Sequence, residues 1–291
     1  MKPQSTHSRA RVLGRALAIA VVLAASPALA GDAMTDSAAA TPATASAAPE
    51  ATESQREAAS ILKRMTEYLA GLQSFTFTSR AGYDVVQASG QKIEFGETRH
   101  ITMARPNQLR VEEVATDGTR DLALFDGKTM TVMNADAGVY AQAPQPGSVD
   151  DALVYFVRDL KLRMPLALLL STRLPTELLP HVRAIDYVES ADIDGVATDH
   201  IAGRTDSVDF QFWITQGDRP LPLRVVITYR QSEGQPQYWA NLTEWNTSPK
   251  LAKTAFQFTP PKDAQRIAFA VQVPRPADTP RPPAAAGEVK P

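Results

Sequence analysis

The feature that most constrains this chain is a run of alternating segments between residues 199 and 258. Gly and Pro turns join the segments, and no helical pattern lies between them. Over 223–230, one set of alternate positions is apolar and the other is mostly polar, and 208–214 repeats the pattern. Because side chains two apart share one face of a strand, this run predicts an antiparallel meander with one apolar face to bury.

The same two-residue period occurs upstream and downstream of this run. Asp117-Gly118 and Asp126-Gly127 are hairpin signals between such segments. Consecutive strands joined by tight turns predict an antiparallel sheet, because parallel strands need longer crossovers. The strands expected outside the run are 75–86, 93–104, 109–115, 120–125, 129–134, 139–142, 182–193, 197–202 and an edge strand in 267–273.

Two helical regions interrupt the strands. Ser54 and Glu57 fit a capping box, and apolar residues follow at helical spacing up to Gly71. Residues 148–181 predict a helical insertion that starts at a second capping box and contains the apolar run 166–170. The predicted fold is therefore mainly β with inserted α. It is one strongly curved antiparallel sheet, a half-open barrel over 54–270, with helices covering the concave face.

The two ends of the chain have the composition of a signal peptide and of disordered segments. Residues 1–30 have a basic start, a short apolar run and the cleavage signal Ala28-Leu29-Ala30, so we expect a signal peptide cleaved after Ala30. Residues 31–53 and 271–291 are rich in Ala and Pro, and they predict a disordered linker and a disordered tail. Removing four positive charges from a chain of net charge −2 leaves −6, which disfavours binding to nucleic acid. No membrane span is expected in the mature chain.

Catalytic and metal-binding patterns are weak. The chain has no cysteine, which excludes disulfides, thiolate nucleophiles and attachment of lipid to an N-terminal cysteine. The histidines His100, His181 and His200 are isolated from one another in sequence, and no spacing typical of zinc or calcium ligands is present. We expect no catalytic residue, no metal and no cofactor.

Several short motifs resemble a family of predicted periplasmic proteins of unknown function. The resemblance covers roughly 54–270 and is densest over 199–246. That family resembles in fold the bacterial lipoprotein carriers LolA and LolB, which are half-open antiparallel barrels with an apolar cavity for acyl chains. The resemblance implies a periplasmic location and this fold, and it implies no reaction. The motifs are Asp199-His200-Ile201-Ala202, Phe210-Gln211-Phe212-Trp213-Ile214, Gly217-Asp218-Arg219-Pro220-Leu221-Pro222, Pro236-Gln237-Tyr238, Glu244-Trp245-Asn246, Phe125-Asp126-Gly127 and Pro165-Leu166.

Strand alternation and the helical insertion define a candidate ligand-binding face. It could be a closed core, or it could admit an acyl chain between the sheet and the helices. Each buried methylene group contributes about 0.8 kcal/mol, so apolar binding of this kind needs no sequence motif. The candidate residues are Phe75, Phe77, Leu109, Val111, Phe210, Phe212, Val225, Ile227, Leu153, Phe156, Leu166 and Leu169.

Alternation also predicts that Trp213, Trp239 and Trp245 lie on the outer face. They form either a local cluster under another part of the chain or a docking patch for an envelope partner. The leading hypothesis is a soluble, non-enzymatic periplasmic protein that binds a lipid, a lipoprotein acyl chain or another apolar ligand. The alternative is a cell-envelope interaction module with a filled core. An enzyme would require an inward cluster of His200 with Asp199 or Glu244.

Overall fold

The computed structural model describes residues 50–160 and 164–269. The expected signal peptide, the linker up to residue 49 and the expected tail lie outside these residues, and those assignments stay predictions. Within the described part of the chain, no helix is both long and apolar enough to cross a membrane.

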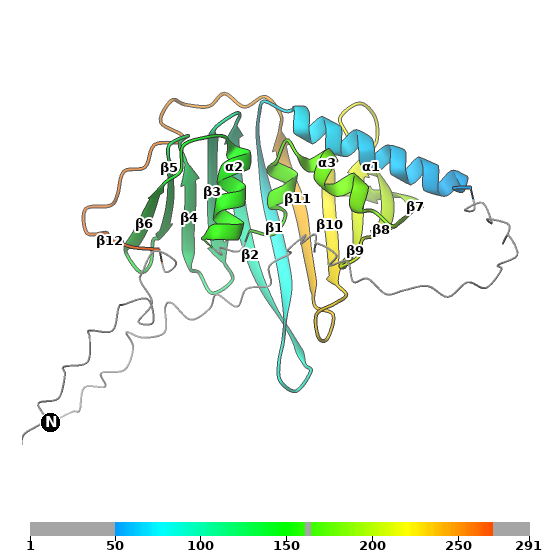
Figure 1. Ribbon diagram of the computed structural model, residues 1–291, viewed down its shortest axis with the longest axis horizontal. Coiled ribbons are helices and arrows are strands. Elements are labelled where there is room, and N and C mark those ends of the chain that lie inside the picture. The colour runs from blue at the N-terminus through cyan, green and yellow to red at the C-terminus, as the bar shows by residue number, and fades with distance from the viewer. Residues whose placement is uncertain (1–49, 161–163, 270–291) are drawn as a thin grey trace, which may run out of the picture.

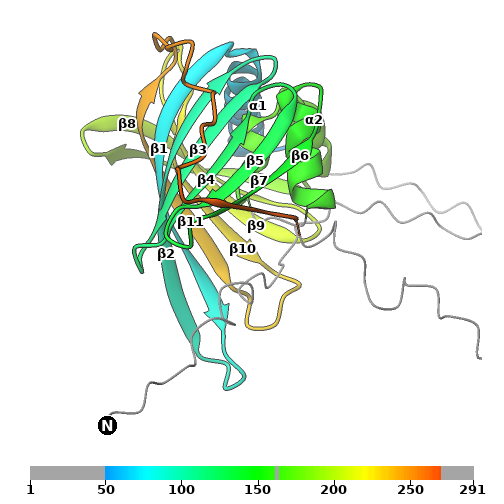
Figure 2. The ribbon, with the colours of Figure 1, turned by 90° about the vertical axis from the view of Figure 1, so that its left-hand side faces the viewer.

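The described strands form one twelve-stranded sheet, in the order β12-β6-β5-β4-β3-β2-β1-β11-β10-β9-β8-β7. Pairing of β1 with β11 joins the first run of strands to the second. The sheet curves strongly and does not close (Figures 1 and 2). The bounds are β1 (Ser74–Val86), β2 (Lys92–Ala104), β3 (Gln108–Ala115), β4 (Arg120–Phe125), β5 (Thr129–Asn134), β6 (Val139–Pro144), β7 (Ala184–Ile193), β8 (Val196–Arg204), β9 (Val208–Thr215), β10 (Pro222–Tyr229), β11 (Gln237–Asn246) and β12 (Gln265–Ile267).

Helices lie along the concave side of the sheet (Figures 1 and 2). This confirms the predicted fold class. An edge strand is present near the expected range 267–273, but it lies earlier: β12 occupies Gln265–Ile267 and pairs parallel with β6, and residues 270–273 lie outside the described part of the chain. The helical elements are α1 (Glu53–Gly71), α2 (Val149–Val154), the π-helical turn η1 (Tyr155–Asp159), η2 (Ala167–Leu170), α3 (Leu174–Leu178) and η3 (Leu179–His181).

Helix α1 begins at a different cap from the one that the sequence suggests. Thr52 is the N-cap, and it forms a capping box with Gln55. The Ser54 hydroxyl binds the edge strand β7 instead. It accepts a hydrogen bond from the Tyr187 N–H at 3.1 Å and donates one to the Tyr187 carbonyl at 3.3 Å. These bonds use edge groups that are otherwise unpaired within the sheet. The second expected capping box, at Ser148 and Asp151, is present at α2.

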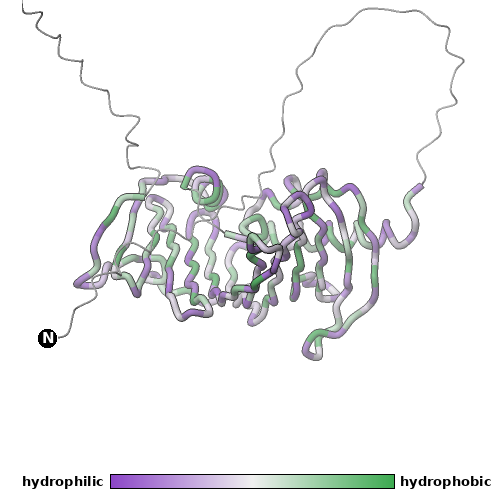
Figure 3. Tube along the Cα trace, turned by 90° about the horizontal axis from the view of Figure 1, so that it is seen from below, coloured by the Kyte–Doolittle hydropathy of each residue, from purple (hydrophilic) through white to green (hydrophobic). Residues whose placement is uncertain are grey.

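The main core lies between the concave face and the helices. Helix α1 contributes a buried stripe that includes Ile61, Leu62, Met65 and Leu69, at the i, i+3, i+4 spacing of an amphipathic helix. Hydrophobic and hydrophilic positions alternate along the strands (Figure 3). The apolar period of two therefore places one face of nearly every strand in this core.

A smaller apolar cluster lies on the convex face of β3–β6. Leu124 and Met133 point to that face by alternation, yet only 2% and 8% of their surface is exposed. The C-terminal strap (residues 247–264) covers them: Arg110 donates to the Ala255 carbonyl, and the Phe258 ring lies 5.3 Å from the ring of Tyr140. The strap thus covers the outer side of this half of the sheet, whereas the helices cover the inner side.

Candidate ligand-binding site

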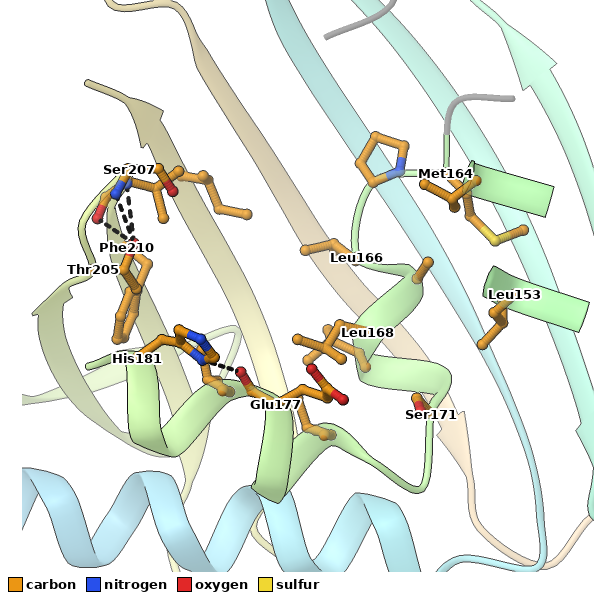
Figure 4. Close-up of a pocket in the computed structure, with 18 of the residues that line it drawn as sticks. Leu153, Met164, Leu166, Leu168, Ser171, Glu177, His181, Thr205, Ser207 and Phe210 are labelled. Atoms are coloured by element: carbon orange, nitrogen blue, oxygen red, sulfur yellow. Dashed lines mark hydrogen bonds between the residues drawn. The ribbon is translucent and has the colours of Figure 1, made fainter. Parts of the chain in front are cut away.

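A cavity of about 480 Å³ lies between the inner face of β9 and β10 and the helical insertion (Figure 4). Its volume falls within the range of about 300–1,000 Å³ that small-ligand pockets occupy. The walls are mostly apolar side chains, and the polar groups gather at the rim.

The sheet side of the cavity is built by alternation. Phe210, Phe212 and Ile227 share the concave face, where Phe212 lies opposite Ile201 of β8, and Ile227 lies opposite Phe210. A Cβ atom on Gly203 would lie only 2.2 Å from the ring of Phe210. A glycine here lets the Phe210 ring lie directly against the backbone of β8 and leaves the space above it open.

The helical side of the cavity comes from α2, residues 164–166, η2 and α3. Leu153, Met164, Leu168 and Leu174 contribute apolar surface to it (Figure 4). Leu166 has a φ of 62°, a left-handed conformation that is unfavourable for a residue with a Cβ atom. The chain changes direction at this residue, and the Leu166 side chain lines the cavity.

Arg105 fixes the position of this helical cover. Its guanidinium group donates to the carbonyl oxygens of Leu72 at 2.8 Å, Leu170 at 2.9 Å and Leu69 at 3.3 Å. It therefore links the end of α1 to the end of η2. Burial lowers the pKa of Arg105, although the nearby carboxylate of Asp150 partly opposes this.

Polar groups at the rim are mostly engaged with the protein itself. His181 Nδ1 lies 2.8 Å from the Glu177 carbonyl oxygen, so this nitrogen carries the proton. Asp150 accepts hydrogen bonds from the amide and the hydroxyl of Thr172. Asp84 accepts a hydrogen bond from the Gln237 amide at 2.9 Å. An apolar interior with an engaged polar rim suits a hydrocarbon chain better than a polar reactant.

The structure divides the twelve candidate residues among the core and two cavities. Phe75, Leu109, Val225 and Phe156 are buried in the core beside the cavity. Phe77 and Val111 line a second, much smaller cavity of about 20 Å³, and Leu166 lines both cavities. The candidate residues that line the main cavity are Leu153, Leu166, Leu169, Phe210, Phe212 and Ile227.

Sequence reasoning omitted other residues of the main cavity. Val208 and Tyr229 line it, and they share the alternation that identified Phe210 and Ile227, so the signal was present. Met164, Leu168 and Leu178 also line it. They lie in short turns whose orientation no periodic pattern predicts.

A buried ionic cluster on the concave face was also missed. Arg99 lies 2.7 Å from the Glu113 carboxylate and 2.9 Å from that of Glu97. Burial alone would lower the pKa of Arg99, but Glu113 and Glu97 outweigh it and raise that pKa. Arg99, Ser79 and Tyr238 form the polar wall of the smaller cavity. The concave face is thus apolar over β9 and β10 and partly ionic over β2 and β3.

The predicted position of Trp245 on the outer face is wrong. Its ring stacks on Phe77 with the centroids 4.2 Å apart, and it packs against the main core rather than on the outer face. The pairing of β1 with β11 shifts between Thr76 and Thr78, and Glu244 has a φ of 57°. This bulge adds one residue to β11 and shifts the alternation by one position. Trp245 therefore points inward, as Tyr238 and Leu242 do before the bulge.

Trp213 and Trp239 lie on the convex face, as predicted. The Arg224 guanidinium carbon lies 5.5 Å from the centre of the Trp213 ring and 5.7 Å from that of Trp239. Trp213 also stacks on His200 at 3.9 Å. Trp239 donates a hydrogen bond to Glu94 at 2.9 Å. We call these residues (His200, Trp213, Arg224, Trp239 and Glu94) the outer ladder.

Of the three histidines that the structure describes, only His181 lines the cavity. His200 belongs to the outer ladder, and its Nε2 lies 3.0 Å from Gln211 Oε1. Glu244 accepts a hydrogen bond from Thr78, which also contacts His100 at 2.9 Å. Neither His200 nor Glu244 lines the cavity. In the described ranges, no group of three or more His, Asp or Glu side chains is placed to hold a metal ion.

The chain matches one protein family and is distantly similar to several solved structures. The family model described as "Predicted periplasmic protein (DUF2092)" matches residues 58–270. No curated protein matches the chain.

Three solved structures illustrate the structural likeness. An uncharacterized conserved protein from Thermus thermophilus is 13% identical with a TM-score of 0.43, over 73% of this chain and 99% of that one. LprF from Mycobacterium bovis is 16% identical with a TM-score of 0.43, over 72% and 98%. The Mycobacterium tuberculosis lipoprotein LppX is 15% identical with a TM-score of 0.43, over 68% and 100%.

Proposed function

Since the chain belongs to the family of predicted periplasmic proteins DUF2092, we propose that it is a non-enzymatic periplasmic protein that binds an apolar chain. The ligand would be the acyl chain of a lipid or of an acylated protein. The observation that carries this proposal is the cavity of about 480 Å³, with apolar walls from both the sheet and the helices.

The composition of the walls supports an apolar ligand. Phe210, Phe212 and Ile227 face Leu153, Leu166 and Leu168 across the cavity. Each methylene group moved from water into such a site contributes about 0.8 kcal/mol. A long chain therefore binds without a dedicated polar partner in the interior.

The construction of the cover also supports binding. It is made of short helical pieces, α2, η1, η2 and α3, rather than one long helix. Short pieces rearrange at lower cost than a packed long helix, because fewer consecutive hydrogen bonds must break. A chain could then enter between the cover and the sheet.

Filling the cavity tests the proposal. Ile227→Trp places a large ring in the cavity, whereas Val226→Trp places the same ring on the opposite face of β10. We expect native mass spectrometry to detect a complex of wild type and of Val226→Trp with dipalmitoyl phosphatidylcholine, and none with Ile227→Trp. Equal binding by both variants, or no binding by wild type, would contradict the proposal.

A second candidate function is docking of an envelope protein on the outer ladder. The observation that favours it is that Trp213 and Trp239 keep partly exposed rings on the convex face, whereas the strap covers the apolar residues of β4 and β5 on that same face. Large apolar groups left at a surface are typical of interaction sites. A photo-crosslinker at Val226, which lies beside Trp239 on the convex face, should give one discrete adduct in cells that disappears in the double variant Trp213→Ala/Trp239→Ala. An unchanged adduct, or none, would contradict docking.

A further inference from the structure

The hairpin formed by β1 and β2 extends well past the ends of the neighbouring strands (Figures 1 and 2). Its two strands are each 13 residues long, and their pairing is uninterrupted from Ser74 with Ala104 to Val86 with Lys92. No bulge changes the alternation along the hairpin, so its two faces are defined over its whole length.

The inner face of the projecting part is apolar. Tyr83 lies opposite Phe95, with the rings stacked at 6.0 Å, and Val85 lies opposite Ile93. Ile93 is 39% exposed, and the other three are half-buried. We call these residues (Tyr83, Val85, Ile93 and Phe95) the inner strip.

The inner strip continues the cavity. Tyr83 belongs to both, because it lines the cavity on the side of β1, next to Pro236 and Gln237. Beyond Tyr83, the inward-facing pair of the hairpin is Val85 and Ile93, whereas the charged residues of both strands in this part alternate to the other face. An apolar chain that leaves the cavity past Tyr83 would therefore meet these apolar side chains.

The outer side of the hairpin is fixed by the loop between β10 and β11. Lys92 Nζ donates to the Gln235 carbonyl at 3.0 Å, and a Cβ atom on Gly234 would lie 2.9 Å from Val86. The hairpin is thus supported from outside, while its inner side presents half-buried and exposed apolar groups. This arrangement makes the hairpin a platform rather than a free loop.

We propose that the inner strip is the second part of the binding site and holds the distal part of an acyl chain that is too long for the cavity. This inference rests on the proposed function, and it narrows the ligand to long-chain lipids or acyl groups. Occupants such as a second copy of this protein are outcomes of the test below.

The test is a chain-length series. Fluorescent N-acyl peptides with progressively longer saturated chains are titrated into wild type, into Val85→Ser/Ile93→Ser and into Val114→Ser. Each methylene group that is buried should raise affinity about fourfold. In wild type this rise should continue for the longest chains, and in the double variant it should stop at a shorter chain, with a loss of about tenfold or more for the longest.

The controls separate the possible failures. Val114→Ser removes the same kind of side chain from an exposed position on the opposite face of the sheet, in β3, so it should follow wild type. Short chains should bind the double variant as they bind wild type, which shows that the cavity is intact. Identical slopes in all three proteins would overturn the inference and leave the proposed function standing, whereas no binding at any length would overturn the proposed function. A wild-type dimer that the double variant converts to a monomer would overturn the inference in favour of self-association.

Discussion

Trp245 of β11 stacks on Phe77 of β1 with the ring centroids 4.2 Å apart and the ring planes 21° apart. Trp245 also donates a hydrogen bond through its indole nitrogen to the Pro222 carbonyl oxygen at the start of β10, at 3.1 Å. One side chain therefore connects three adjacent strands. These strands include the pair that joins the two halves of the sheet.

Removing the Trp245 ring should destabilise the whole domain. Trp245→Ala removes the ring that packs on both Phe75 and Phe77, and large-to-small changes of this kind cost about 3–5 kcal/mol when the ring is fully buried. Because Trp245 is half-buried, we expect a loss of about 2–3 kcal/mol in urea unfolding. Trp213→Ala should cost less, since that ring lies on the convex face. Equal losses would contradict the inward placement of Trp245.

The bulge that turns Trp245 inward depends on the backbone of Glu244, which has a φ of 57°. Glu244→Gly and Glu244→Val both remove the carboxylate that accepts a hydrogen bond from Thr78, so their difference isolates the backbone. A β-branched residue in the left-handed region costs about 1–2 kcal/mol relative to glycine. We expect the valine variant to unfold at a lower urea concentration than the glycine variant. The opposite order would show that β11 has no bulge there.

Alternation explains how much of this fold the sequence predicts. The strands that contain Phe210, Phe212, Val225 and Ile227 keep a period of two, and the structure places those residues on one face. The period fails at Trp245, because a single left-handed residue shifts the register and leaves no mark in composition. Side-chain period therefore predicts a face reliably only up to the next bulge.

The remainder of the site depends on contacts between distant segments. Leu168 reaches the cavity because Arg105 bonds the end of η2 to the end of α1, and sequence spacing does not encode such a link. The cluster of Arg99, Glu97 and Glu113 shares the parity of the apolar residues Ile101 and Val111. A search for apolar positions alone does not find this ionic cluster. A charged residue can occupy a core face when its charged partners lie there too.

Arg105 gives a prediction about the helical cover. Arg105→Met should lower the free energy of unfolding by about 2–4 kcal/mol, because three carbonyl oxygens lose a charged donor. Hydrogen exchange of the amides in η2 should quicken more than exchange in β9, since the bond to Leu170 holds η2 in place. Arg80→Met, on the exposed side of β1, is the matched control. Unchanged exchange in η2 would show that Arg105 does not hold the cover.

Asp121 predicts an unusual dependence of stability on pH. Burial, followed by the nearby Glu113 carboxylate, raises the pKa of Asp121 above its ordinary value. A carboxyl group whose pKa is raised on folding favours the folded state when protonated and penalises it when ionised. Its penalty therefore appears as pH rises from the unfolded pKa, about 3.9, through the folded pKa, and it persists at neutral pH.

Asp121→Asn should consequently be more stable than wild type at pH 7, and the gain should vanish as the pH falls below about 3.9. The substitution keeps an oxygen that accepts the hydrogen bond from Asn134, so packing changes little. Asp136→Asn is the control of opposite sign, because Arg120 lowers the pKa of Asp136. That variant should be less stable than wild type at pH 7, and the difference should narrow as the pH falls below about 3.9. Urea unfolding of the three proteins between pH 3 and pH 7 measures both effects, and a stability gain for Asp121→Asn that is the same at every pH would show that ionisation is not its cause.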